Sequence, residues 1–296
     1  MKQTIMTEIG NITDKNHNQV LRMWNAQIPD GKRPLQHHQH FNFEIMYVNS
    51  GSGTYTTKLT EHPILPGDIF VFSSNEFHSI TNVGPEGLKI TNLQCNPQFL
   101  WNTASDTQTH IKLNFCFTHS AEFSNRLPAS DAESLMHILC QIEEDLSTKA
   151  PEYRLSVKAL LHLLLIHLVR HHHYLDTHTA INHEQLHSIQ HTLTYIDTHF
   201  AEKITLQELS ALAGLTPTYF STLFKEVVGI SLWNYISARR IDKAIHLITD
   251  EDCKKNMIDI AAECGFNNTA NFNKTFKKVT GMTPREYRSG EFAEIS

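Results

Sequence analysis

The stretch FSTLFKEVVGIS at residues 220–231 returns 52 residues later as FNKTFKKVTGMT at residues 272–283. The two copies share phenylalanines at their first and fifth positions, a lysine at the sixth, a valine at the eighth and a glycine at the tenth. The segments before them also correspond, because LSALAGL (209–215) aligns with IAAECGF (260–266). An internal repeat of this kind indicates two copies of one supersecondary unit.

Each copy carries the start and stop signals of two short helices. In the first copy, Thr205 and Glu208 predict a capping box at the start of one helix. Pro217 then suits the first position of the next helix, which Gly229 ends. The second copy repeats this order, and a longer helix is predicted over about 232–249. Each copy is therefore predicted to be a helix-turn-helix, whose second helix can enter the major groove of DNA.

Helical spacing divides each second helix into an apolar and a polar face. The residues predicted to point inward are Phe220, Leu223, Phe224 and Val227 in the first unit and Phe272, Phe276 and Val279 in the second. The residues predicted to point outward are Thr218, Ser221, Thr222 and Lys225 in the first unit and Thr269, Asn271, Asn273, Lys274 and Lys277 in the second. Asparagine can bond the edge of adenine, serine and threonine bond several bases, and lysine contacts guanine or phosphate. We therefore predict that the outward residues bind double-stranded DNA.

Charge alone does not decide between this interpretation and an ordinary solvated surface. Residues 183–290 carry twelve Lys and Arg and twelve Asp and Glu, so their net charge is zero. The second helix of the second unit, however, carries Lys274, Lys277 and Lys278 and no acid. Positive charge is thus concentrated where a DNA phosphate could lie.

Residues 184–289 closely resemble the DNA-binding domain of the AraC/XylS family of transcription regulators. The motifs that carry the resemblance are ITLQELSALAGLTPTYFSTLFKEVVGISLWNYISARRIDKAIHLI and IDIAAECGFNNTANFNKTFKKVTGMTPREYR. The resemblance implies two helix-turn-helix units that read successive major grooves on one face of the DNA. It places the base-reading positions at the predicted outward residues other than Lys225 and Lys277. Many relatives carry Arg or Gln near 221–222, where this chain has small hydroxyls, so we expect the second unit to carry more of the specificity.

The N-terminal half has a different pattern of apolar and polar residues. Between about 18 and 120, short alternating runs such as FEIMYV, TYTTKL and IFVF are separated by Gly, Pro and Asn, which predicts antiparallel strands closing as a sandwich or small barrel. From 130 to 173 the period becomes helical, which predicts a helical hairpin. Ser130 with Glu133 predicts a capping box at its start.

These patterns together predict an α+β chain with three parts. Residues 1–125 form a β-barrel, which the AraC/XylS resemblance implies to be cupin-like and ligand-sensing. Residues 126–182 form a helical hairpin and linker, and residues 183–290 form an all-α domain of two helix-turn-helix units joined by a long helix. In the hairpin, an apolar seam is predicted to pair two subunits as a homodimer, and its residues are Leu160, Leu161, Leu164 and Leu168.

A spaced set of histidines and a glutamate marks the predicted barrel. The pattern His38-x-His40-x3-Glu44-x6-Gly51 resembles the first cupin motif, and His78 lies in a stretch that resembles the second, although Ser73 and Asn75 replace its usual Pro and Gly. This agrees with the AraC/XylS resemblance, which implies a cupin-like N-terminal domain. Three imidazoles and a carboxylate could hold Zn²⁺, Ni²⁺, Mn²⁺ or Fe²⁺.

Three interpretations of this set stay open. A metal at His38, His40, Glu44 and His78 could do chemistry, it could bind without turnover, or the polar groups could bond a ligand or one another without metal. A DNA-reading partner domain removes the need for catalysis, so we predict a regulator and not an enzyme, with no cofactor required. The predicted effector-binding residues are His38, His40, Glu44, Tyr47, Tyr55 and His78. Aromatic faces with a few polar groups suit a sugar or a related polar metabolite.

The composition of the chain indicates which classes of protein it can belong to and in which compartment it is expected. The chain has 296 residues, 40% of them hydrophobic, and a net charge of −6, which excludes a uniformly basic nucleic-acid coat. Its five cysteines include no CxxC pair, which is typical of free thiols in a reducing cytosol. The most apolar stretch, ALLHLLLIHLV (159–169), is about half the length that spans a bilayer. We therefore expect a cytoplasmic protein without a membrane partner. The AraC/XylS resemblance implies in addition a transcription activator that contacts RNA polymerase.

Overall fold

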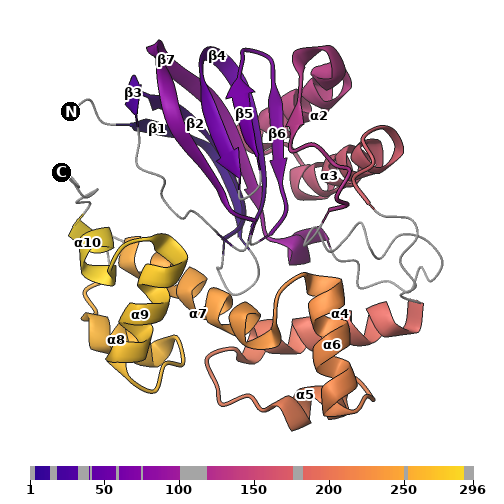
Figure 1. Cartoon of the computed structure of the whole chain (residues 1–296), viewed down its shortest axis with the longest axis vertical. Helices are drawn as coiled ribbons and strands as arrows, with labels where there is room; N and C mark the ends of the chain where they lie inside the picture. Colours follow the sequence, from indigo (N-terminus) through magenta and orange to yellow (C-terminus); the bar gives the residue numbers. More distant parts are fainter. Residues whose placement is uncertain are drawn as a thin grey trace. The chain divides into compact units, whose positions relative to one another are not determined.

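The structure is a computed structural model, which describes residues 4–13, 19–32, 40, 42–57, 60–74, 76–100, 119–175, 183–249 and 253–289. Two compact units make up the chain (Figure 1). Met1–Gln36 and Asn42–Ala180 belong to the first unit, and His37–Phe41 and Ile181–Ser296 belong to the second. An antiparallel β domain with helices is followed by a wholly helical domain, so the predicted fold class is confirmed.

The N-terminal unit is built on one antiparallel sheet. Its strands are β1 (Ile5–Thr13), β2 (Gln19–Ile28), β3 (Gly31–Lys32), β4 (Phe43–Thr57), β5 (Glu61–Ile64), β6 (Ile69–Phe72), β7 (His78–Cys95) and β8 (Arg126–Leu127). The main order is β1-β2-β7-β4-β6-β8, with β3 added to β7 and β5 added to β4. The two long strands pair along their whole length, from Phe43 opposite Cys95 to Thr57 opposite His78.

Register shifts in the β4–β7 pair allow these strands to bend. One shift falls between Gly51 and Gly53 and another between Val48 and Ser50. Gly51 has a φ of +90°, and a Cβ there would lie 2.0 Å from the carbonyl oxygen of Gly87. Only glycine tolerates both this conformation and this close approach, so the bend depends on it.

The two faces of the sheet pack into separate cores, because successive side chains of a strand point to opposite faces. On one face, Phe43, Ile45 and their neighbours pack against α2 (Ala129–Thr148), α3 (Tyr153–His171) and the 3-10 helix η1 (Pro97–Leu100). On the other face, aromatic and aliphatic side chains from both ends of β4 and β7 meet in a second core. Its members include Trp24, Met46, Tyr55, Phe70, Phe72 and Ile90.

The helical hairpin is present, but two of its predicted details are wrong. The apolar face of α2 is buried as predicted, at Leu135, Leu139, Ile142 and Leu146. The N-cap is Pro128 without a side-chain cap, and Ser130 lies inside the helix, where its hydroxyl donates to Asp131. The predicted dimer seam is also not available to a partner: Leu161, Leu164 and Leu168 are at most 1% exposed in the core of their own subunit, and Leu160 packs against that core.

The C-terminal unit repeats its elements in the predicted order. Its helices are α4 (His183–His199), α5 (Leu206–Leu212), α6 (Pro217–Val228), α7 (Leu232–Thr249), α8 (Met257–Glu263), α9 (Thr269–Thr280) and α10 (Pro284–Ser289). The capping box between Thr205 and Glu208 is formed. Gly229 and Gly281 end α6 and α9 with the same φ of 80°, which confirms that the two glycines have one structural role.

Helix α4, which packs against the first helix-turn-helix repeat, is fixed to α7 by a buried polar cluster. Arg239 on α7 donates to Asp197 on α4 at 2.7 Å, and the Tyr235 hydroxyl lies 3.2 Å from the same carboxylate oxygen. Asp242 accepts a further bond from Arg239 at 3.1 Å. In the second unit, Phe272 and Phe276 of α9 pack with residues of α7 and α8. The long helix α7 therefore supports both repeats.

No helix within the described ranges combines the length and apolarity needed to cross a bilayer.

Candidate DNA interface and candidate ligand sites

The second helix of each repeat presents the face that its periodicity predicts. In α6 the predicted inward residues are all buried, and in α9 Phe272 and Phe276 are 0% exposed while Val279 is half-buried. Of the nine predicted DNA-binding residues, seven are exposed and two, Ser221 and Thr269, are half-buried. The exposed ones are Thr218, Thr222, Lys225, Asn271, Asn273, Lys274 and Lys277. Each helix thus offers one polar face that its own core does not occupy.

The hydroxyls of α6 are partly engaged within their own helix. Ser221 Oγ donates to the carbonyl of Pro217 at 3.0 Å, and Thr222 Oγ1 donates to that of Thr218 at 3.2 Å. A hydroxyl that donates to its own backbone presents mainly acceptor lone pairs outward. The face of α6 is therefore a weaker reader of bases than its residue types alone indicate.

The face of α9 is more polar and more positively charged. Asn271, Asn273, Lys274, Lys277 and Lys278 are all exposed. The helix start is fixed by its N-cap, because Oδ1 of Asn268 accepts from the backbone N–H of Asn271 at 2.8 Å. This cap defines where the first turn of α9 begins, and it fixes the backbone that carries Asn271 and Asn273. Amide and ammonium groups on one capped helix suit base edges and phosphates respectively.

The predicted effector residues do not share one cavity. His38 lies outside the described residues. Tyr47 lies on the face of β4 that packs against the helices, whereas Glu44 and Tyr55 face away from them. Tyr55 is 3% exposed, and its ring stacks against both Phe70 and Phe72, with ring centroids 5.0 and 4.9 Å away. Burial, followed by the charges of Glu44 and Glu76, raises the pKa of the Tyr55 hydroxyl well above its usual range.

A cavity of about 230 Å³ lies instead between the sheet and α2. Its lining residues are Met23, Ile45, Tyr47, Asn49, Thr91, Leu93, Met136, Leu139, Cys140 and Glu143. Asn49 donates to Thr91 at 2.9 Å, and Thr91 donates to Asn25 at 2.7 Å, so part of the lining carries a short chain of hydrogen bonds. Most of the other lining residues are apolar, and Glu143 adds a carboxylate.

Sequence reasoning missed most of this lining. Of the five predicted effector residues that the structure describes, only Tyr47 contributes to the cavity. A signal was available, because Tyr47 and Asn49 are two residues apart and so share one face of β4. The contribution of Glu143 needed knowledge of how α2 packs on the sheet.

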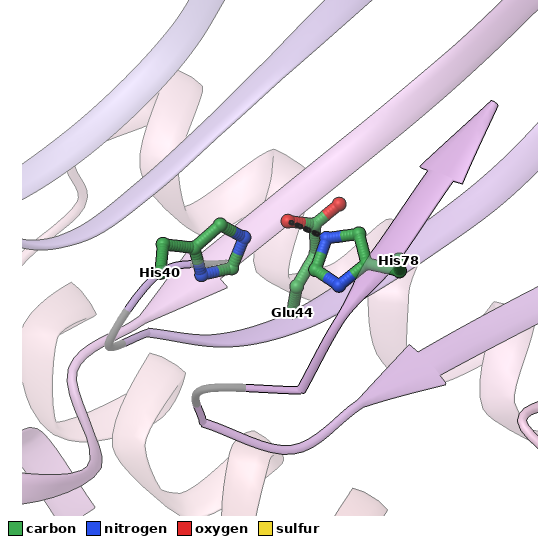
Figure 2. A group of neighbouring side chains, drawn as sticks. All are labelled: His40, Glu44 and His78. Carbon is green, nitrogen blue, oxygen red and sulfur yellow. Dashed lines mark ion pairs between the residues drawn. The ribbon is translucent and has the colours of Figure 1, made fainter. Parts of the chain in front are cut away.

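His40, Glu44 and His78 lie together, and Figure 2 shows their side chains side by side. One ligand atom from each lies within 4.8 Å of the others. Nε2 of His78 is 3.6 Å from Oε2 of Glu44, and both side chains are almost fully buried. Glu44 also accepts from Nε2 of Gln94 at 2.8 Å. Three of the four predicted metal-ligating residues are thus brought together, and the fourth, His38, lies outside the described residues.

A second polar cluster was not predicted. Nε2 of His119 is 3.0 Å from Oε1 of Glu76, which also accepts from Asn125 at 2.8 Å. Burial raises the pKa of Glu76, but its hydrogen bonds, led by that from His119, outweigh burial and hold it below the usual value. Burial likewise lowers the pKa of His119, but the bond and charge of Glu76 outweigh it and leave the pKa raised. The pair therefore holds opposite charges over a widened pH range.

Comparison with known proteins connects both halves of the chain to one family. Residues 29–165 match an AraC-like ligand binding domain, and residues 209–290 match a helix-turn-helix domain. The chain belongs to the AraC family of helix-turn-helix transcription regulators. Both matched domains are regulatory, which agrees with the prediction that this is not an enzyme.

Relatives and solved structures extend this picture. An uncharacterized HTH-type transcriptional regulator of Staphylococcus aureus is 26% identical over 222 residues, which is 75% of this chain and 28% of the relative. The probable transcriptional regulator LumQ of Photobacterium leiognathi is 35% identical over 94 residues, which is 32% of this chain and 37% of LumQ. This chain thus spans between about a quarter and two fifths of the length of these two relatives.

A crystal structure of ToxT from Vibrio cholerae, bound to an unsaturated fatty acid, superposes with a TM-score of 0.59 over 91% of this chain and 94% of ToxT. The two sequences are 14% identical, so the likeness establishes a shared fold.

Proposed function

We propose that this AraC-family protein is a sequence-specific DNA-binding regulator whose N-terminal domain responds to a small-molecule effector. The observation that carries the proposal is the duplicated unit, in which α6 and α9 each bury an apolar face and expose a polar one. Two such units supported by one helix match what is needed to enter the major groove twice. The role as an activator, the contact with RNA polymerase, the homodimer and the cytoplasmic location stay predictions.

The two reading helices contribute unequally in this proposal. Asn273 and Lys274 lie on the exposed face of α9, next to further lysines that can neutralise phosphates. The hydroxyls of Ser221 and Thr222 on α6 already donate to their own helix. We therefore assign most of the base discrimination to α9, and mainly positioning to α6.

We assign the effector to the cavity between the sheet and α2. Its lining combines aliphatic side chains with the hydroxyl of Tyr47, the Asn49–Thr91 pair and the carboxylate of Glu143. None of the described lining residues carries a positive charge, so the site favours a neutral or cationic molecule over an anion. The volume is below the roughly 300–1,000 Å³ of drug-sized pockets, which indicates a compact ligand with an apolar body. The sugar or related polar metabolite that the sequence predicts as the effector stays a prediction, and it is the second candidate for this cavity.

Because α2 forms one wall of this cavity, an occupant would act directly on the helical hairpin. A ligand that binds two arrangements of α2 with different affinity would shift the balance between them. The main core of the domain packs on the same helix, so a displacement of α2 would be shared with α3.

DNA recognition is tested by measuring discrimination in variants of the full chain. A duplex enriched from a random pool is compared with a scrambled duplex for wild type, Asn273→Ala and Lys274→Ala. Each variant is expected to lose about 1–3 kcal/mol of discrimination, because each removes one group that can bond a base edge. Lys89→Ala, an exposed lysine on β7, serves as the matched control and should change nothing. Unchanged discrimination in both α9 variants would remove the basis of the proposal.

The effector site is tested separately by thermal stabilisation with a panel of small neutral, cationic and anionic compounds and sugars. Compounds that stabilise the wild-type protein should lose their effect in Thr91→Val, which removes a hydroxyl at nearly constant volume. Cationic compounds should also lose it in Glu143→Gln, which removes the charge. Stabilisation that is equal in wild type and in both variants would place the effector elsewhere.

A further inference from the structure

The loop that joins α4 to α5, at residues 200–205, lies against the turn of the second helix-turn-helix repeat. In that turn, between α8 and α9, Gly265 has a φ of +82°, and a Cβ built on it would lie 2.5 Å from the carbonyl oxygen of Ala201. No side chain fits there unless the loop moves, so the two segments touch backbone to backbone.

The first repeat has a glycine at the corresponding position of its own turn, which is Gly214. Its φ is +68°, and no described atom beyond its chain neighbours lies within 4 Å of the position of a Cβ. The positive φ is therefore a property of the helix-turn-helix turn, whereas the close approach at Gly265 is a property of the contact with the loop after α4.

Arg240 of α7 holds the same loop. Its Nε donates to the carbonyl oxygen of Phe200 at 2.7 Å, and its Nη2 donates to that of Glu202 at 3.0 Å. Both carbonyls follow directly on the end of α4, where the negative end of the helix dipole favours a cation. A planar guanidinium that bonds two acceptors fixes the direction of the loop as well as its distance from α7.

Arg240 also contacts the second repeat. Its guanidinium carbon lies 5.8 Å from the ring centroid of Phe266, within the range of a cation–π contact. Phe266 is 7% exposed and belongs to the core that α7, α8 and α9 share. One side chain thus connects the loop after α4 to the core of the second repeat.

The place of Arg240 on α7 gives this connection its importance. Before it, Tyr235 and Arg239 bond to Asp197 of α4, and after it, Ile241 belongs to the core of the second repeat. Figure 1 shows α7 between the helices of the first repeat and those of the second. A single long helix can bend, so α7 alone leaves the repeats free to turn relative to each other. The loop contact is a second connection beside the helix, and it resists that motion.

We propose that Arg240 is a positioning residue that sets the orientation of α9 relative to α6, and with it the separation between the two DNA segments that the chain reads. The inference rests on the proposed function, because it concerns the spacing of the two reading helices. One base pair added between the segments moves the second by about 3.4 Å and turns it by roughly 34–36° around the duplex axis. A fixed pair of helices accepts one separation, whereas a loosened pair follows the second segment to neighbouring separations.

The first experiment measures the orientation of the two helices without DNA. Spin labels are attached to ketone-bearing residues placed at the exposed positions Glu226 on α6 and Lys278 on α9 of the full chain, so that the native cysteines stay unlabelled. Double electron–electron resonance should give one narrow distance distribution for the wild-type protein and a broader one for Arg240→Gln. Arg240→Lys should also broaden it, because one ammonium nitrogen replaces the two nitrogens that bond the loop. Equal widths in wild type and both variants would overturn the proposal.

The second experiment measures how DNA affinity depends on the separation of the two segments. The wild-type chain first selects its segments from a random pool, and duplexes with one base pair removed or added between them are then compared. Wild type should lose about tenfold or more in affinity at each altered separation, because α9 no longer meets its base edges. Arg240→Gln should bind the original duplex more weakly and lose less than about threefold on the altered ones.

Salt dependence separates this role from a direct DNA contact. The slope of log affinity against log salt should be the same in Arg240→Gln as in wild type, since the loss of a phosphate contact would reduce it by about 0.9. A reduced slope, or a dependence on separation as steep as that of wild type, would overturn the inference. Failure of wild type to select any sequence would instead contradict the proposed function, and the distance measurement would still decide whether Arg240 orients the helices.

The two corresponding glycines provide the matched comparison. Gly214→Ala and Gly265→Ala impose similar backbone strain, because both positions have a positive φ. Only the new Cβ of Gly265→Ala meets the loop, so only this variant should change the distance distribution and the preferred separation. Circular dichroism shows whether each variant folds. The same change in both variants would assign the effect to strain within a turn and would contradict the proposal.

Discussion

Removing the N-cap of α9 should lower both the stability of the C-terminal domain and its affinity for DNA. In Asn268→Ala the backbone N–H of Asn271 loses the acceptor that now lies 2.8 Å away. Loss of such a cap costs about 1 kcal/mol, which lowers the melting temperature of a domain of this size by roughly 4–8 °C. The first turn of α9, which carries Asn271, is then no longer fixed before DNA binds. If binding must reorder that turn, the affinity for DNA should fall about fivefold, because 1.4 kcal/mol corresponds to a tenfold change.

The matched comparison is Thr205→Ala, which removes a similar cap from α5. The Thr205 hydroxyl accepts from the N–H of Glu208 at 3.3 Å, in a capping box that the Glu208 carboxylate completes. This variant should lose a similar amount of stability and keep its DNA affinity, since α5 is not one of the two proposed reading helices. Scanning calorimetry of the full chain and fluorescence anisotropy with a labelled duplex measure the two effects. The reasoning is refuted if both variants lose stability and neither loses affinity for DNA. It is also refuted if both variants lose the same amount of affinity.

Three further predictions follow from named contacts. Lys274→Ala combined with Lys277→Ala should reduce the slope of log affinity against log salt by about 1.8, since each phosphate contact contributes about 0.9, and an unchanged slope would exclude these lysines from the interface. The pKa of His119 is raised above its ordinary value of 6.5, so its stabilising effect is complete below that pH and is lost as pH rises through the raised pKa. The melting temperature of the N-terminal domain should therefore fall on the alkaline side of pH 6.5 in the wild type, and a similar fall in His119→Ala would contradict this. Asp197→Asn should destabilise the C-terminal domain by about 3–5 kcal/mol, because it breaks a buried ion pair. Calorimetry should show this loss and an unchanged N-terminal transition.

The C-terminal domain could be predicted from sequence in detail because its signals are local. Capping residues, glycine stops and a helical apolar stripe each act within one or two turns, so Thr205, Gly229 and Phe272 specify their neighbourhood without distant partners. The duplication adds a second, independent copy of each signal. What the sequence did not show was the state of the hydroxyls of Ser221 and Thr222, which turn back onto their own helix.

The N-terminal domain was predictable in class but not in its sites. Alternation predicts strands, yet the face that each strand residue occupies depends on which partners fold over it. Glu44 and Tyr47 are three residues apart and so lie on opposite faces of β4, which separates the predicted effector residues into two groups. The leucines of α3 illustrate the same point, because a helix that is apolar on one side can face its own sheet or a second subunit. Here Leu161, Leu164 and Leu168 face the subunit's own core.

The most direct test of the central claim is the ratio of two dissociation constants of the full chain at physiological salt. One is measured for a duplex selected from a random pool, and the other for a scrambled duplex of identical composition. A regulator that reads bases through α6 and α9 should bind the selected duplex about 10³-fold or more tightly. A ratio near one would contradict the account, because the exposed polar faces of both helices would then contribute only non-specific contacts to the DNA backbone.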